Sequence, residues 1–377
     1  MINIQSLIPR HFVRTMAMHY LYAFHIHKEA IYQNSIVEIE GNFKFDVFSK
    51  EPINEQQLAN EKNQALDYFK ALEISDRFCG VKNFHKKPGN AVIDNKVWGN
   101  YQLQLTKEVN VLKNGLQAIL NDILDAYLLT LKLVLEWFII AKKQVTASDQ
   151  LETTITVPRA LSENPILEFL STNTAFQNLF KDRKLTWNED IHLVVRWYNQ
   201  FIKNAEFLQH INATEVQNKD YEIVKVILQK IIWEQNDIQN YFENRYLGWE
   251  EIKFIVKNLW SNVYPDSILE IFQYKAVFIE PATSFYERLI YSILEKDSFL
   301  EELMQQYSKA WSLERLVLLD RVIIKLGLCE MHYLPDTPGK VVISEYVYLA
   351  KKYSTSKSLA FVNGMLDAVA KQYNFLT

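Results

Sequence analysis

The chain has 377 residues, more than the roughly 100–200 residues of a typical domain, so one large domain or two smaller ones are expected. Its 41 basic and 45 acidic side chains give a net charge of −4. This balance excludes a protein that attracts polyanions over its whole surface and leaves a nucleic-acid site only as a local feature. Hydrophobic residues make up 49% and charged residues 23% of the chain, as in globular proteins, which excludes general disorder.

Glycine is scarce, with nine residues in the chain, and no two glycines lie closer than nine positions. Phosphate-binding loops need closely spaced glycines, so the scarcity of glycine disfavours the common nucleotide-dependent enzymes and favours long helices. Cys79 and Cys329 cannot form a disulfide framework or a closed thiolate zinc site, which indicates a reduced protein. The amino terminus has no signal-peptide pattern, and the most apolar stretch, 119–141, carries charged residues. We therefore expect a cytoplasmic protein without a membrane span.

The spacing of apolar residues predicts a mostly helical chain. A first helix is predicted over 10–32, and residues 37–47 then alternate apolar and polar side chains around Gly41-Asn42, which predicts a short β-hairpin. Helical spacing returns over 54–73, and a lysine-bearing loop follows over 78–99. Further helices are predicted over 103–146, 163–181, 189–205, 214–244, 249–259, 267–278, 285–294, 297–307, 313–333, 340–353 and 358–372.

Motifs in a fixed order fill the last part of the chain, residues 311–371. They are E-R-L…L-D-R (314–321), a P-x-x-P turn, K-V-V-I-x-E, L-A-K-K-Y and F-V-N-G-x-L-D (361–367). Near the amino terminus, Arg10 and Arg14 precede the segment Y-L-Y-A-F. Together these segments resemble the transcription antitermination factor NusB family, over about residues 9–26 and 283–372.

The resemblance implies an all-α, NusB-like helical bundle in which residues 1–33 pack against residues 281–377. Residues 34–280 are then a large, mostly helical insertion that carries the hairpin, with the family's second helix expected within 111–145. By resemblance, the protein is a non-enzymatic factor of transcription antitermination and termination, with no cofactor and no metal. It would bind a single-stranded boxA-type element of nascent ribosomal RNA together with ribosomal protein NusE, within the RNA polymerase antitermination complex.

Six side chains are the expected RNA contacts, namely Arg10, Arg14, Tyr22, Tyr353, Lys357 and Phe361. The two arginines lie one turn apart on one helix face, where they can contact successive phosphates, although both are also ordinary solvated side chains. The three aromatic residues match family positions associated with RNA, where a flat ring stacks on a base, and the competing interpretation is packing in the core. Lys357 lies in the loop beside Tyr353, within reach of a phosphate.

Asp320 and Arg321 are the expected contacts to the ribosomal-protein partner, and the alternative is an ion pair within the fold. Asn363-Gly364 interrupts a helical pattern, which we interpret as a place where a small residue lets two helices approach. Two other functions stay open: a protein-interaction scaffold that keeps the fold without RNA, and a module associated with RNA methyltransferases. The scarcity of glycine and the absence of cysteine nucleophile motifs disfavour the methyltransferase.

Overall fold

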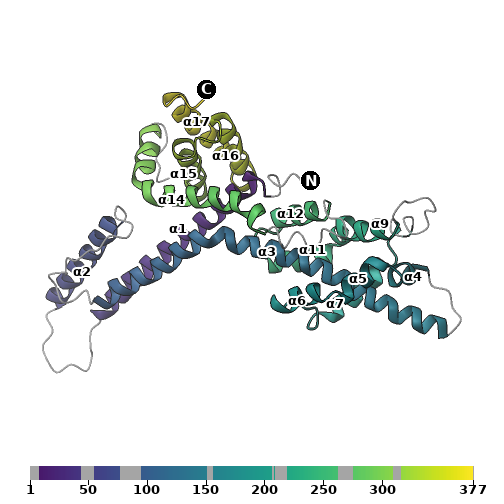
Figure 1. The fold of residues 1–377 in the computed structure, drawn as a ribbon. Helices are drawn as coiled ribbons and strands as arrows, with labels where there is room; N and C mark the ends of the chain where they lie inside the picture. Colours follow the sequence, from purple (N-terminus) through teal and green to yellow (C-terminus); the bar gives the residue numbers. More distant parts are fainter. Residues whose placement is uncertain are drawn as a thin grey trace, which may run out of the picture. The chain divides into compact units, whose positions relative to one another are not determined.

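The computed structural model describes residues 8–43, 55–76, 95–150, 156–205, 208, 219–261, 275–308 and 316–376. Within these ranges the chain forms helices joined by turns and contains no strand (Figure 1), which confirms the all-α prediction. The chain divides into two compact units. We call residues 117–282 the central unit, and residues 10–116 together with 283–377 the terminal unit.

The terminal unit combines helices from both ends of the sequence. They are α1 (Arg10–Asn42), α2 (Glu55–Asp76), the first part of α3 (Asn95–Gln150), most of α14 (Lys275–Tyr307), α15 (Leu318–Tyr333), α16 (Gly339–Tyr353) and α17 (Ser356–Gln372). α15 packs against α1, α16 and α17, and all of its residues from 322 to 331 are buried. A helix that is buried on every side forms the core of its domain, and α15 has this place in the terminal unit.

The predicted β-hairpin is wrong for the residues that the structure describes, because α1 continues to Asn42. Its buried positions here are Ile31, Ser35 and Ile39, which are four residues apart, whereas Val37 is 66% exposed. The buried face packs on a cluster that includes Phe69 of α2 and residues 97–101 of α3. The alternation at 37–42 therefore reflects a helix with one buried residue per turn, while residues 44–47 lie outside the described part.

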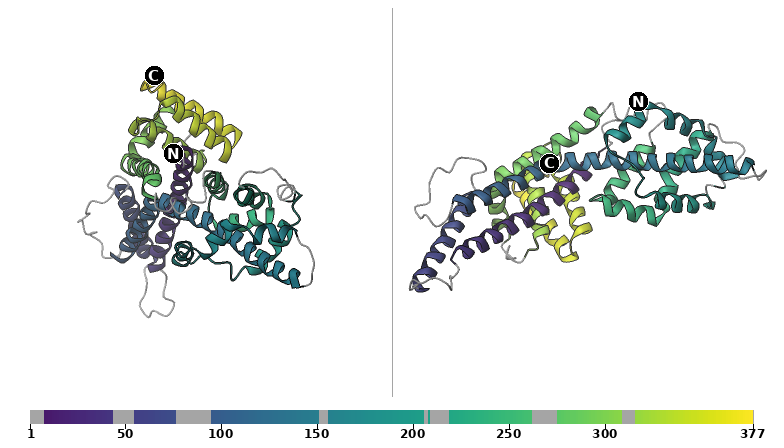
Figure 2. Two further views of the ribbon diagram at one scale, coloured as in Figure 1. Left: turned by 45° about the vertical axis from the view of Figure 1, so that its right-hand side comes forward. Right: turned by 90° about the horizontal axis from the view of Figure 1, so that it is seen from below.

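α1 and the first part of α3 lie side by side in both views of Figure 2. They approach closely at Gly115 of α3, where an added Cβ would lie 2.6 Å from Cγ of Tyr20 on α1. Gly364 of α17 does not mediate such an approach, since an added Cβ there would meet nothing within 4 Å. Our interpretation of Asn363-Gly364 as a close helix contact is therefore wrong.

Two predicted helices, 285–294 and 297–307, are joined in α14, with a kink at Lys296 where the backbone is non-helical (φ −107, ψ 17). Residues 340–353 and 358–372 are helical as predicted, in α16 and α17. The predicted loop over 78–99 is wrong at residues 95–99, which form the start of α3, and its residues 78–94 lie outside the described part. The predicted helix start at 267–274 and the motif residues 311–315 also lie outside the described residues.

The central unit packs short helices around the second part of α3. They are α4 (Thr156–Ser162), α5 (Pro165–Thr172), α6 (Thr174–Asp182), α7 (Ile191–Phe201), α9 (Lys219–Val226), the π-helical segment η2 (Ile227–Ile231), α10 (Ile232–Glu234), α11 (Asn236–Arg245) and α12 (Trp249–Ser261). Aromatic rings dominate its core. Tyr127 of α3 stacks on Trp260 at 4.0 Å, and Trp137 stacks on Phe201 at 4.7 Å. Among the described helices none is long and apolar enough to cross a membrane.

The contact at Gly115 predicts a stability change. In Gly115→Ala the new methyl group overlaps the Cγ end of the Tyr20 ring, so α1 and α3 have to separate. We expect this to lower the free energy of unfolding by about 1–3 kcal/mol. Gly364→Ala is the matched control, because open space surrounds it and alanine favours a helix by up to about 1 kcal/mol. Urea unfolding of both variants measures the difference. Equal stability of the two variants would contradict the close approach.

Candidate nucleic-acid interface

A buried ion pair joins the first helix to the carboxy-terminal helices. The side chain of Arg14 on α1 is 3% exposed and that of Glu330 on α15 is fully buried. The guanidinium donates two hydrogen bonds to the carboxylate, from Nη2 to Oε1 at 2.6 Å and from Nε to Oε2 at 2.9 Å. The hydroxyl of Tyr346 on α16 donates a third, to Oε2 at 2.9 Å. One carboxylate therefore holds three helices together.

The charges in this network are mutually stabilised. Burial disfavours the charged form of Arg14, but the hydrogen bonds and the charge of Glu330 outweigh burial and raise the pKa of Arg14 above its ordinary value. Burial also raises the pKa of Tyr346 well above its ordinary value, so its hydroxyl stays a proton donor. The Arg14 guanidinium therefore stays charged although it is buried.

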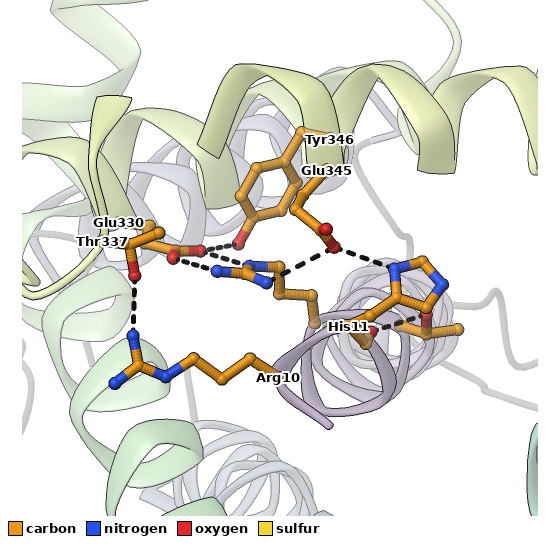
Figure 3. A network of polar contacts seen from close by, with 8 residues as sticks. Arg10, His11, Glu330, Thr337, Glu345 and Tyr346 are labelled. Atoms are coloured by element: carbon orange, nitrogen blue, oxygen red, sulfur yellow. Dashed lines mark hydrogen bonds and ion pairs between the residues drawn. The ribbon is translucent and has the colours of Figure 1, made fainter. Parts of the chain in front are cut away.

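The outer part of the network contains Arg10 and His11 (Figure 3). Nη1 of Arg10 donates to the hydroxyl of Thr337 at 2.9 Å, and the guanidinium carbon lies 5.2 Å from the centre of the Phe285 ring. Nδ1 of His11 lies 2.9 Å from Oε2 of Glu345. Arg10 is exposed, so its charge faces solvent although its position is fixed by two contacts.

The structure corrects the predicted role of Arg14. A phosphate contact needs an exposed guanidinium, and Arg14 is instead enclosed and paired with Glu330. We therefore assign Arg14 a structural role. Arg10 remains exposed and stays a predicted RNA contact, one turn away from the buried pair.

The remaining predicted RNA contacts lie near the junction of α16 and α17. Tyr353 ends α16, Lys357 is exposed in the first turn of α17, and Phe361 follows one turn later, half-buried. Tyr22 of α1 is 38% exposed. It lies one helical turn after His19, whose ring makes an edge-to-face contact with Tyr353 at 5.2 Å. The fold thus brings the predicted aromatic residues of α1 and α16 to neighbouring positions.

The α16–α17 junction is positively charged. Lys351 and Lys352 lie in the last turn of α16 and Lys357 in the first turn of α17, and all three are exposed. Nζ of Lys352 lies 5.1 Å from the centre of the Tyr353 ring. Within the described part of the chain, Lys351 and Lys357 have no ion-pair partner. Their charges are available to an anion.

Of the two residues predicted to contact the ribosomal protein, one is buried and the other is partly exposed. Asp320 is 2% exposed and accepts a hydrogen bond from Oγ of Ser354 at 2.5 Å, so the prediction that it lies on a docking surface is wrong. It links the start of α15 to the α16–α17 junction. Arg321 keeps 38% of its side chain exposed, and its Nη2 lies 3.2 Å from both carboxylate oxygens of Glu301.

A second buried charge lies one turn further along α15. Nζ of Lys325 is 2.6 Å from both Oδ1 of Asp297 and Oε1 of Glu301, and its side chain is 3% exposed. Burial, helped by the charge of Lys325, lowers the pKa of the neighbouring His25 to about 4. His25 is therefore neutral near pH 7.

Sequence analysis named Arg14 but missed its partner Glu330 and the buried Lys325. The available signal was the composition of α15, an apolar helix whose charged residues include three that are buried, namely Asp320, Lys325 and Glu330. Such residues are rarely buried unless paired, so a helix that is apolar all round predicts partners for them. Among the residues described, no group of three or more His, Cys, Asp or Glu side chains is placed to hold a metal ion.

Comparisons with known proteins agree with the carboxy-terminal motifs. Residues 262–371, which include α15, α16 and most of α17, match the NusB family. The chain is 39% identical over 89 residues to the transcription antitermination protein NusB of Thermodesulfovibrio yellowstonii, which covers 24% of this chain and 59% of that protein.

Two further relatives carry the same name. The protein of Bacillus licheniformis is 36% identical over 90 residues, covering 24% of this chain and 70% of the relative. That of Bacillus velezensis is 32% identical over 109 residues, covering 29% of this chain and 81% of the relative. The chain spans 59% to 66% of the length of four of the NusB proteins that it matches. No solved structure gives a significant match.

The buried ion pair predicts a large effect of a single substitution. Arg14→Met leaves Glu330 buried without its cation, which is expected to lower the free energy of unfolding by about 3–5 kcal/mol. Adding Glu330→Leu removes the unpaired charge and is expected to recover a large part of this loss. Arg159→Met is the control, because its ion pair with Glu163 is exposed. A loss in Arg14→Met no larger than in the control would contradict the assignment.

The low pKa of His25 predicts acid sensitivity. The unfolded chain binds a proton near pH 6.5 and the folded chain only near pH 4, so stability is full above about pH 6.5 and falls as the pH drops through that window. The contribution lost is about 2–3 kcal/mol. In His25→Gln this part of the pH dependence should disappear, whereas His27→Gln, at a 56% exposed position, should keep it. Urea unfolding at pH 7 and pH 4.5 measures the free energy of unfolding of each variant. An equal loss of stability between the two pH values in His25→Gln and His27→Gln would refute the effect.

Proposed function

Because the chain belongs to the NusB family, we propose that it is a cytoplasmic, non-enzymatic factor of transcription antitermination and termination that binds single-stranded RNA. The proposed ligand is a boxA-type element of nascent ribosomal RNA. The protein would bind it together with ribosomal protein NusE, as part of an RNA polymerase antitermination complex.

The observation that carries this proposal is the α16–α17 junction. It combines exposed cations without a described carboxylate partner, Lys351 and Lys357, with the aromatic residues Tyr353 and Phe361. Single-stranded RNA is bound by this combination, because lysines contact phosphates and rings stack on unpaired bases, each stack contributing about 1–3 kcal/mol. The junction lies within residues 262–371, which match the family.

α1 extends the proposed surface. Tyr22 neighbours the junction through His19, and Arg10 lies twelve residues earlier on the same helix, about 18 Å along its axis. A distance of this size suits a segment of several nucleotides. The buried pair of Arg14 and Glu330 fixes α1 against α15, and therefore fixes the register between Arg10 and the junction.

The partner protein is proposed to bind the same matched region. Of the two residues predicted for it, Arg321 retains exposed side chain, while Asp320 supports the fold. The central unit is proposed to make no RNA contact. Its 16 basic and 22 acidic side chains between residues 117 and 282 give a net charge of −6, which disfavours binding to a polyanion.

The second candidate is a protein-interaction scaffold that keeps the NusB-like fold without RNA. Two observations favour it: the net charge of the central unit, and the burial of Arg14, which leaves one exposed arginine at the start of α1. The two candidates differ in a direct measurement of RNA binding.

The test is fluorescence anisotropy of the full chain with a short ribosomal-leader RNA and a scrambled RNA, with and without NusE. The proposal predicts a preference for the leader sequence that increases when NusE is present. Phe361→Ala should reduce leader affinity by about five- to 150-fold, which corresponds to the loss of one stacked base. Phe169→Ala, at a 53% exposed position of the central unit, is the control and should leave affinity unchanged.

Thermal melting of Phe361→Ala separates stacking from packing, because loss of a core ring would lower stability by about 3–5 kcal/mol. A folded wild-type chain that binds neither RNA in either condition would exclude the proposed function and favour the scaffold.

A further inference from the structure

A second exposed arginine lies beside Arg10, although it is far away in the sequence. Arg288 is on α14, one turn after Phe285, whose ring packs against the Arg10 guanidinium at 5.2 Å. Its Nη1 lies 2.8 Å from Oδ2 of Asp336 in the turn between α15 and α16. The next residue of that turn, Thr337, accepts the hydrogen bond from Arg10.

Two arginines are therefore held by adjacent residues of one turn. Arg288 lowers the pKa of Asp336, and Arg10 adds to the effect, so one carboxylate experiences both charges. Arg288 and Asp336 are 47% and 54% exposed, and Arg10 is also exposed. All three charged groups are therefore accessible from solvent at one turn of the chain.

We propose that Arg10 and Arg288 form a phosphate-binding pair for the RNA backbone, and that the Asp336 carboxylate occupies this pair when RNA is absent. The inference rests on the proposed function and specifies one of its contacts. Arg288 supplies the second cation that Arg14, enclosed against Glu330, does not supply. The proposed pair thus takes one arginine from the start of α1 and one from α14, whereas the sequence predicted two arginines on successive turns of α1.

The exchange of anions is favourable for physical reasons. An exposed arginine–aspartate pair contributes little to stability, so releasing Asp336 has a small cost. A phosphodiester accepts hydrogen bonds from guanidinium groups in the same planar geometry as a carboxylate, and its binding releases counterions from the RNA. Asp336 then acts as an internal competitor that weakens binding to any phosphate.

Substitutions on the two sides of the pair test the proposal with opposite signs. Arg288→Gln should weaken leader-RNA binding by about tenfold and reduce the salt slope by about 0.7, the value for one lost single-strand phosphate contact. Asp336→Asn should strengthen binding by up to about fivefold, because it removes the competing anion from an exposed pair that contributes little to stability. A merely structural ion pair would not increase affinity when it is broken.

Arg196 and Asp237 of the central unit provide a matched control. They form a similar exposed pair, with 3.2 Å between Nη2 and Oδ2, and Arg196→Gln and Asp237→Asn should both leave RNA binding unchanged. Melting temperatures of all four variants should stay close to that of wild type, since each breaks an exposed pair.

The outcomes separate this inference from the proposed function. If the wild type binds leader RNA but Arg288→Gln leaves the affinity and the salt slope unchanged, the inference is wrong and the proposed function stands. The same holds if Asp336→Asn weakens binding. No binding by the wild type overturns the proposed function and this contact with it. Calorimetry with inorganic phosphate alone addresses a free-ion site. Saturable phosphate binding that Arg288→Gln abolishes, with RNA affinity unchanged, would assign the pair to free phosphate and overturn its role in RNA binding.

Discussion

The terminal unit depends on one carboxylate that has no access to water. Glu330 can be buried only because Arg14 and Tyr346 give it three hydrogen bonds, and each of these partners comes from a different helix. An unpaired charge at this depth would oppose folding strongly, so the packing of α1, α15 and α16 is tied to one geometry. The apolar contacts of α15 supply most of the driving force, while the ion pair specifies which face of α1 is inside.

This constraint also organises the outer surface. Because Arg14 faces inward, Arg10 one turn earlier faces Thr337 and Phe285 at the edge of the same network. Tyr22 lies two turns beyond the buried pair, next to the α16–α17 junction. The cations and rings proposed to contact RNA thus lie on helices whose positions are fixed by buried charges. Rigid mounting reduces the entropy lost when a flexible ligand binds.

The sequence alone predicts the all-α class and most of the helices, because helical periodicity is a local property. It fails where two structures share one local pattern: residues 37–42 alternate as a strand would, but the distant partners on α2 and α3 select a helix with one buried residue per turn. The site shows the same limit. Arg14 has the chemistry of a phosphate contact, and only the position of Glu330, 316 residues later, shows that it is enclosed. Asp320 is a further case, since its partner Ser354 is not predictable from spacing.

The sequence separation within the ion pair has a consequence for synthesis on the ribosome. At about 5–20 residues per second, the 316 residues between Arg14 and Glu330 take roughly 15 to 60 seconds to translate. During this time the apolar face of α1 has emerged and its partner α15 does not exist, whereas every residue of the central unit from 117 to 282 is made before α15 begins. The face of nascent α1 that packs on α15 is therefore uncovered for this time, although α2 and the first part of α3, its other partners, are already made. Apolar surface exposed in this way is of the kind that chaperones bind. The terminal unit closes last, only after its carboxy-terminal helices have left the ribosome.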